Sequence, residues 1–431
     1  MKNLDFRLRV NDINAARYRG FFRLSGSLAN NGKGVSLTDT KTLTSQWAKL
    51  AAVTSVHFFI DTFGGMFPAI MPDIRIEFGW SLATASWVLC ILTLCCNAGQ
   101  VATGHLRADK DKPLFLQLGM VLSTAICFMC LLGGMLYAFQ IMLVLAVMTG
   151  LGIALTHPEG LRAVHTLDKI PSPISTAIFM TGGAMGFASG GFIGSFLVSR
   201  FGLNGLLYFL VFPVFAIALV YLLRVKLAVE PKSGEVTKLQ DEGNYSFWAI
   251  FLMAVPTTAA STVLVYLLPT RLNELGFELT FGGFSTMLFG FGGAGGSIVW
   301  SIIAHKKGQL GCAVASIVLG LPLLVWYLFK IEDRNAVYLL IAAGFCLWGC
   351  YPLLVSICRT ARGMNLGGRM GMIVGGAWGL GGLIEMLLVL IEERFDLGVE
   401  TLLYFVPVSF MMTAVIGLAI MYGRSREKKV S

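Results

Sequence analysis

The chain is divided into repeated apolar stretches of about 20 residues, separated by short polar segments. An α-helix rises about 1.5 Å per residue, so a stretch of this length crosses a hydrocarbon core of about 30 Å. We therefore expect an all-α membrane protein with twelve transmembrane helices. The predicted spans lie near residues 48–72, 82–106, 114–136, 139–161, 173–199, 204–223, 246–270, 281–304, 310–330, 336–359, 368–391 and 399–422.

The composition agrees with a chain that lies mostly in lipid. Charged residues make up 13% of the sequence and hydrophobic residues 56%, whereas a soluble domain has about 25% charged residues. The nine cysteines lie in or beside apolar stretches, so no disulfide framework is expected. The net charge of +9 forms no basic stripe on a soluble face, so nucleic acid is not an expected partner.

Lysine and arginine are distributed unequally between the two sides of the predicted membrane. An even number of spans places both termini on one side, and all but six of the 33 Lys and Arg residues lie in or next to segments on that side. Such residues gather in the cytoplasm. We expect both termini to be cytoplasmic and the protein to lie in a bacterial inner membrane. The six residues on the opposite side are Arg75, Arg200, Arg271, Lys330, Arg334 and Arg394.

The longest internal polar run separates two sets of six spans, which we interpret as two bundles. The expected parts are a basic cytoplasmic tail (1–47), a first bundle (48–223), a cytoplasmic linker (224–245), a second bundle (246–422) and a short tail (423–431).

An internal repeat indicates that the two bundles are pseudo-symmetric. The segment 72–79 after the first span aligns with 269–276 after the seventh, because proline, glutamate and glycine coincide. Later in each half the pattern Gly-Gly-Ala-x-Gly occurs, at 182–186 and at 375–379. Parallel six-helix repeats with a solute site between them describe a known transporter architecture.

These features resemble the major facilitator superfamily over about residues 48–422. The loop Gly104-His-Leu-Arg-Ala-Asp109-Lys110 is similar to the superfamily's loop motif after span 2, which implies a gating role for these three numbered residues. The resemblance also implies that spans 2, 5, 8 and 11 form the surface along which the halves rock. Glycines there allow close helix contact, and the candidates are Gly186, Gly190, Gly191, Gly375, Gly376 and Gly379.

Two shorter segments give a more specific resemblance. His57-Phe-Phe-Ile-Asp61 in span 1 and His157-Pro-Glu159-Gly-Leu-Arg162 in span 4 resemble the fosmidomycin-resistance branch of the superfamily, whose members are similar to drug exporters. This resemblance implies export of a small organic or phosphonate-like solute. Cationic groups near the cavity would suit an anion.

Ionisable residues inside predicted spans are candidates for the site, because a charge in a bilayer is costly unless it is paired or hydrated. His57 and Asp61 share one helical face, so they form either a proton-binding pair or a buried ion pair that only orients the helix. Pro158 is expected to kink span 4, which can aim both His157 and Glu159 toward the central cavity.

The remaining ionisable candidates each leave two readings open. Glu159 and Arg162 lie three residues apart and can pair on the helix surface, either structurally or as a gate. Glu385 is the one acid within span 11, so it is either a second proton site or a partner for Arg359 or Arg362. Trp348, Tyr351 and Trp378 either line the cavity or serve in packing.

The leading hypothesis is a proton-coupled secondary transporter that exports its solute by alternating access. A proton-coupled importer of a small metabolite is the alternative. A membrane-embedded enzyme and a ligand sensor are less favoured, because hydrolase and phosphate-binding motifs are absent from the sequence. The expected partners are a small solute, protons and lipid, with no cofactor, no metal and a monomeric state.

Overall fold

The computed structural model describes residues 37–106, 110–170, 172–229, 245–363 and 366–430. Residues Ala48–Ser431 form one compact unit. The described chain is helical, and its only β contact is an isolated bridge between Ser246 and Arg362. Twelve helical segments in the described residues are long and apolar enough to cross a membrane, which confirms the predicted all-α membrane fold.

The first six crossings precede residue 230. They consist of α2 (Leu37–Phe78), α3 (Leu82–Leu106), α4 (Leu114–Ser123) with the 3-10 segment η2 (Thr124–Leu132), α5 (Ala138–Val164), α6 (Ser172–Phe201), and η3 (Leu203–Leu210) with α7 (Val211–Leu222).

The second six crossings follow residue 245. They consist of α8 (Phe247–Glu274), α9 (Leu279–Lys307), α10 (Gln309–Phe329), a crossing of η4 (Arg334–Tyr338), α11 (Leu339–Leu347) and α12 (Cys350–Cys358), a crossing of α13 (Leu366–Gly371), η5 (Met372–Gly376) and α14 (Ala377–Phe395), and α15 (Val399–Val430).

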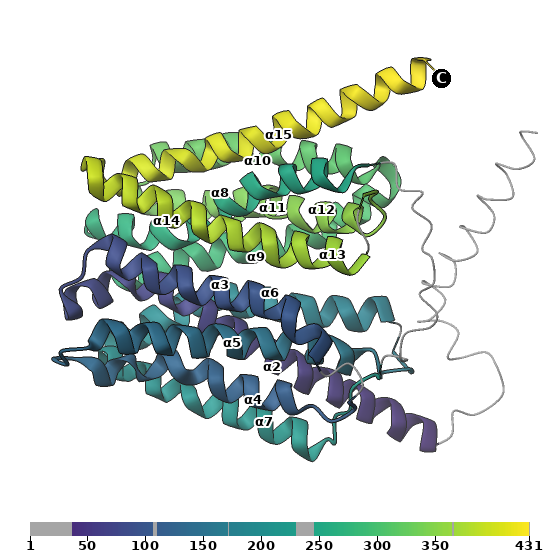
Figure 1. Ribbon diagram of the computed structural model, residues 1–431, viewed down its shortest axis with the longest axis horizontal. Helices are drawn as coiled ribbons and strands as arrows, with labels where there is room; N and C mark the ends of the chain where they lie inside the picture. Colours follow the sequence, from purple (N-terminus) through teal and green to yellow (C-terminus); the bar gives the residue numbers. More distant parts are fainter. Residues whose placement is uncertain (1–36, 107–109, 171, 230–244, 364–365, 431) are drawn as a thin grey trace, which may run out of the picture. The chain divides into compact units, whose positions relative to one another are not determined.

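The two sets of helices form two bundles that meet along two pairs of helices. α3 packs against α14, and α6 packs against α9 (Figure 1). We call the side with the short connections near residues 79, 134, 202, 276 and 398 the hairpin side, and the side that carries residues 229 and 245 the linker side.

The repeated segments end their helices in the same way. Gly79 and Gly276 have positive φ values of 64° and 86°. In each case the residue after the glycine donates its N–H to the carbonyl five residues back, at 3.0 Å. This left-handed helix ending favours glycine, so the coincidence of glycine in the two halves has a direct backbone cause.

The glycines singled out in the sequence pack in different places. A Cβ atom at Gly186 or Gly190 would clash with the backbone carbonyl of Phe58 or Thr62, so these two glycines pack α6 against α2 within the first bundle. A Cβ atom at Gly191 would instead lie 2.7 Å from Thr286 Oγ1 of α9, across the bundle boundary.

The corresponding glycines of the second bundle also divide between packing within the bundle and packing across the bundle boundary. Gly375 is buried within the π-helical turn η5, and Gly376 faces Phe251 of its own bundle. A Cβ atom at Gly379 would lie 3.9 Å from Leu94 Cδ2, across the boundary. Close packing therefore serves both the bundles and the surface between them.

Candidate functional site

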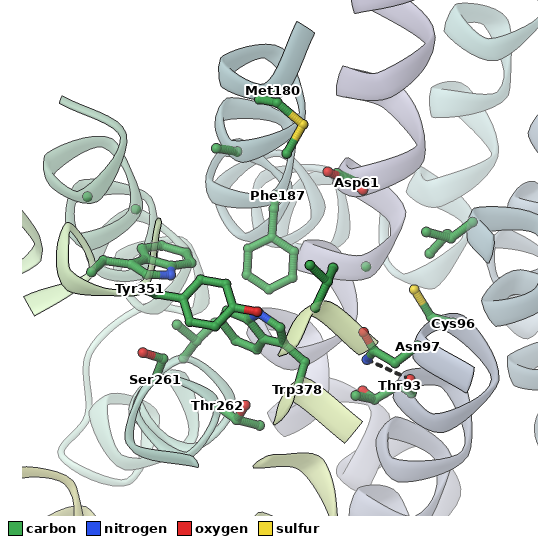
Figure 2. Close-up of a pocket in the computed structure, with 18 of the residues that line it drawn as sticks. Asp61, Thr93, Cys96, Asn97, Met180, Phe187, Ser261, Thr262, Tyr351 and Trp378 are labelled. Atoms are coloured by element: carbon green, nitrogen blue, oxygen red, sulfur yellow. Dashed lines mark hydrogen bonds between the residues drawn. The ribbon is translucent and has the colours of Figure 1, made fainter. Parts of the chain in front are cut away.

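A central pocket lies between the bundles. Its volume is about 350 Å³, within the range of small-molecule sites. Helices α2, α3, α5 and α6 line it from the first bundle, and α8, α9, α12, η5 and α14 from the second (Figure 2). The pocket is thus positioned where both bundles can contact one solute.

His57, Asp61 and His157 form a triad on the wall of this pocket. His57 Nε2 lies 3.2 Å from Asp61 Oδ2, and His157 Nε2 lies 3.2 Å from Asp61 Oδ1. The two imidazole rings meet edge to face, with centroids 4.8 Å apart. The triad therefore joins α2, where His57 and Asp61 are one turn apart, to α5.

The second nitrogen of each imidazole is held by a backbone carbonyl. His57 Nδ1 lies 2.8 Å from the carbonyl oxygen of Phe179, and His157 Nδ1 lies 2.9 Å from that of Ile153. A carbonyl oxygen only accepts, so each Nδ1 carries a hydrogen and donates it. Each Nε2 can then donate to Asp61 only when the ring carries a second proton. The contacts of the triad therefore strengthen when a histidine binds a second proton and weaken when it loses that proton.

The three members of the triad differ in access. The side chain of His57 is 2% exposed, whereas those of His157 and Asp61 are 21% and 18% exposed. A Cβ atom at Gly183 of α6 would clash with the His57 ring and would lie 2.6 Å from Asp61 Oδ2. The glycine motif repeated in the two halves therefore leaves space for the triad in the first half, a role that the sequence analysis did not assign.

Glu159 lies away from the pocket, contrary to the expectation that Pro158 aims both of its neighbours inward. Glu159 is buried, and its Oε2 accepts the N–H of Leu116 in the first turn of α4 at 2.9 Å. Residues two apart on a helix point in nearly opposite directions, so His157 reaches the pocket and Glu159 reaches the neighbouring helix. The carboxylate also suits the positive end of the α4 dipole.

Arg162 and the loop after α3 lie near the linker side. Arg162 donates to the carbonyl oxygens of Ala228 and Lys110, at 2.8 and 2.6 Å. Gly104 lies within α3. Asp109 falls outside the described residues, so its predicted gating role stays a prediction. Arg162 does not line the pocket. It instead hydrogen-bonds two backbone segments, one earlier and one later in the chain than Arg162 itself.

Glu385 is fully buried in α14, at 0% exposure. Its Oε1 accepts a hydrogen bond from Ser86 of α3 at 3.3 Å, and its Oε2 has no hydrogen-bond partner among the described residues. Of the two roles that the sequence left open, the partnership with Arg359 or Arg362 is wrong. Both arginines follow α12 on the linker side, whereas Glu385 lies in the half of α14 toward the hairpin side.

Contacts between the bundles close the pocket on the hairpin side. Ser86 bonds Glu385, and the hydroxyl groups of Thr93 and Tyr266 are 2.8 Å apart. A Cβ atom at Gly283 of α9 would clash with the carbonyl of α6 opposite it. Met180 lies closer to the linker side, and it lines the pocket while remaining 55% exposed. The structure is therefore closed toward the hairpin side.

The rest of the wall combines aromatic rings with neutral polar groups. Trp348, Tyr351 and Trp378 all line the pocket, which decides the choice that the sequence left open. Sequence reasoning missed Thr93, Asn97 and Gln100 of α3 and Ser261 and Thr262 of α8. The spacing of Thr93, Asn97 and Gln100 places the three polar side chains on one helical face. This pattern could have identified them as pocket-lining residues from the sequence.

The fold and the central pocket define an integral, multi-pass membrane transporter of small solutes. The chain belongs to the Major Facilitator Superfamily, whose family model matches residues 53–386. It is a transporter and not an enzyme. The Fosmidomycin resistance protein of Escherichia coli (strain K12) is a relative with 20% identity over 398 residues, which covers 88% of this chain and 95% of that protein.

Solved structures of other transporters share the fold. A bacterial homologue of the human lysosomal transporter Spinster, inward-facing and occupied, gives a TM-score of 0.64 at 14% identity, over 88% of this chain and 96% of that chain. A bacterial homologue of the iron transporter ferroportin, outward-facing, gives 0.59 at 14% identity, over 88% and 99%.

Proposed function

We propose that this protein is a proton-coupled secondary transporter that exports a small organic solute by alternating access. The observation that carries the proposal is the triad of His57, Asp61 and His157 on the wall of the central pocket. Its position supports the proposal, because proton binding at these residues would take place within reach of a bound solute. Proton and solute can therefore influence each other's binding directly.

Protons act in this account by changing the contacts of the triad. A proton on Nε2 of either histidine creates a charge-assisted hydrogen bond to Asp61. Loss of that proton leaves a lone pair facing the carboxylate, and at His157 this weakens the link between α2 and α5. A solute that binds beside Asp61 therefore contacts a triad whose geometry depends on how many protons the triad has bound.

The alternation of access would use the boundary between the bundles. On the hairpin side the boundary depends on a few small contacts, including Ser86 with Glu385 and Thr93 with Tyr266. Their separation would open the pocket to that side. Small residues on the facing helices allow such sliding without large changes in packing.

Other observations support the proposed orientation in the membrane and the proposed direction of transport. The excess of Lys and Arg on the linker side supports a cytoplasmic location for both termini, so the pocket would open toward the cytoplasm in this conformation. The name of the E. coli relative supports export. The domain boundaries, the monomeric state and the bacterial inner membrane stay as expected from the sequence, and proton-coupled import is the alternative.

Proton movement driven by a solute tests the proposal. Everted membrane vesicles of a bacterium that lacks its main exporters would be acidified inside by respiration, and ethidium would then be added. Export by antiport releases lumenal protons, so ethidium should raise the fluorescence of a quenched pH-gradient dye. Vesicles that contain Asp61→Asn should show no such rise.

Asp333→Asn is the matched control, because Asp333 is an exposed acid that caps η4 and asparagine is an equally good cap. It should behave as the unchanged protein does. Proton uptake from the medium by right-side-out vesicles on addition of solute would instead favour the importer. A response in Asp61→Asn equal to that of the control would contradict coupling at Asp61.

A further inference from the structure

The wall of the pocket has no fixed positive charge. None of the lining residues in the described part of the chain is a lysine or an arginine. Besides the two histidines, the polar donors on the wall are hydroxyl, thiol, indole and amide groups, such as those of Thr93, Asn97 and Gln100. A phosphate or phosphonate is normally bound by arginine, lysine or a helix N-terminus.

The two histidines do not supply the missing donors. His57 and His157 each direct Nδ1 to a backbone carbonyl and Nε2 to Asp61. All four ring nitrogens are therefore engaged within the protein, even when both rings are protonated. An oxyanion that entered the pocket would meet the Asp61 carboxylate, which is 18% exposed, and would find no free imidazole N–H to bind it.

Aromatic rings from both bundles line the pocket. Phe187 and Trp348 meet edge to face with centroids 6.2 Å apart, and Tyr351 and Trp378 do so at 5.4 Å. The Tyr351 hydroxyl donates to the carbonyl of Ile373 in the π-helical turn at 2.7 Å, so this ring is fixed in place. Figure 2 shows Phe187, Tyr351 and Trp378 around the pocket, with Asp61 beyond Phe187.

Flat apolar molecules fit this wall better than compact anions. Aromatic faces bind rings by stacking and bind cations through their negative quadrupole. We infer that the pocket selects flat, mainly apolar organic molecules without an anionic group and rejects phosphonates. This inference rests on the proposed transport function and narrows its solute class, since the phosphonate-like solute expected from the sequence lacks a binding group here.

Equilibrium binding to the purified protein tests the selectivity without any proton gradient. Ethidium, a flat monocation, would be titrated while its fluorescence anisotropy is measured, and fosmidomycin would be added as competitor at constant pH. Ethidium should bind, and fosmidomycin should fail to displace it at a hundredfold excess. Trp378→Ala and Tyr351→Ala should each weaken ethidium binding by about 3- to 10-fold.

Trp326→Ala is the control for the loss of an aromatic ring, because Trp326 of α10 is exposed and lies outside the pocket wall. It should leave ethidium binding unchanged. If Trp378→Ala, Tyr351→Ala and Trp326→Ala all bind ethidium as tightly as the unchanged protein, the aromatic wall is not the binding surface and the inference fails.

A gain of binding provides the complementary test. Gln100→Arg adds a guanidinium to the pocket wall, and Gln309→Arg adds the same group at the exposed start of α10, where Gln309 bonds Ser356. The concentration of fosmidomycin that displaces ethidium should be at least tenfold lower for Gln100→Arg than for the unchanged protein. It should be unchanged for Gln309→Arg.

The overturning result is fosmidomycin binding to the unchanged protein as tightly as ethidium, or no ethidium binding at all. These results are separable from a failure of proton coupling. Ethidium binding without solute-driven proton release would overturn the transport mechanism while the solute class stands.

Discussion

Ser86 of α3 donates a hydrogen bond to Glu385 of α14 across the boundary between the two bundles, at 3.3 Å. Both residues are fully buried, and their contact lies on the closed hairpin side of the pocket. A buried carboxyl group with a single hydrogen-bond partner is sensitive to the loss of that partner. We therefore predict that the pair acts as a latch on the closed side of the pocket.

Ser86→Ala should shift the protein toward a conformation open on the hairpin side. A buried acceptor without a partner costs about 1–3 kcal/mol, and each 1.4 kcal/mol changes a population ratio by about tenfold. Spin labels at Leu136 and Phe395, which are both exposed near the hairpin side, should report a longer distance. Ser301→Ala, on the exposed linker-side part of α9, should leave the distance distribution unchanged. An identical distribution in Ser86→Ala would rule out the latch.

Gly186→Ala and Gly191→Ala should separate packing within a bundle from packing between bundles. At Gly186 the added methyl group meets the backbone of Phe58, which cannot move independently, so the unfolding temperature should fall, with a cost of roughly 1–3 kcal/mol. At Gly191 it meets the Thr286 hydroxyl of the other bundle, so the same labels should show opening with a smaller thermal effect. Equal thermal losses in both variants would contradict this division.

Glu159→Ala should destabilise the first bundle, whereas Glu159→Gln should be mild. The amide oxygen of glutamine can still accept the N–H of Leu116, and alanine cannot, so the alanine variant should lose about 1–3 kcal/mol. Thermal unfolding of the purified proteins measures this difference. If Glu159→Gln folds normally but no longer transports ethidium, the carboxylate has a transport role beyond its hydrogen bond to α4.

The predictable features of the fold depend on local chemistry. Span length and apolar content predict twelve crossings because each helix must satisfy its own backbone hydrogen bonds in lipid. The glycines at 79 and 276 predict equivalent helix ends, because a left-handed residue is needed there. The pairing of His57 with Asp61 also follows from the sequence, since both lie on one face of α2.

The site beyond this pair depends on contacts between distant segments. Glu159 has its partner at the start of α4, and Glu385 has its partner 299 residues away in α3. These partners could not be predicted from the sequence, because packing between the helices sets the rotation of each helix about its axis and so the neighbour that each side chain faces. The space that Gly183 leaves for the His57 ring is likewise a consequence of how α6 lies on α2.

Coupling at Asp61 is tested most directly in liposomes that contain Asp61→Asn. Two quantities would be measured: accumulation of ethidium driven by a pH gradient, and exchange of labelled for unlabelled ethidium at equal pH on both sides. The asparagine side chain cannot take part in proton binding, yet the pocket and both bundles remain. Exchange should therefore persist while driven accumulation falls to the level of empty liposomes. Accumulation equal to that of the unchanged protein would contradict the account.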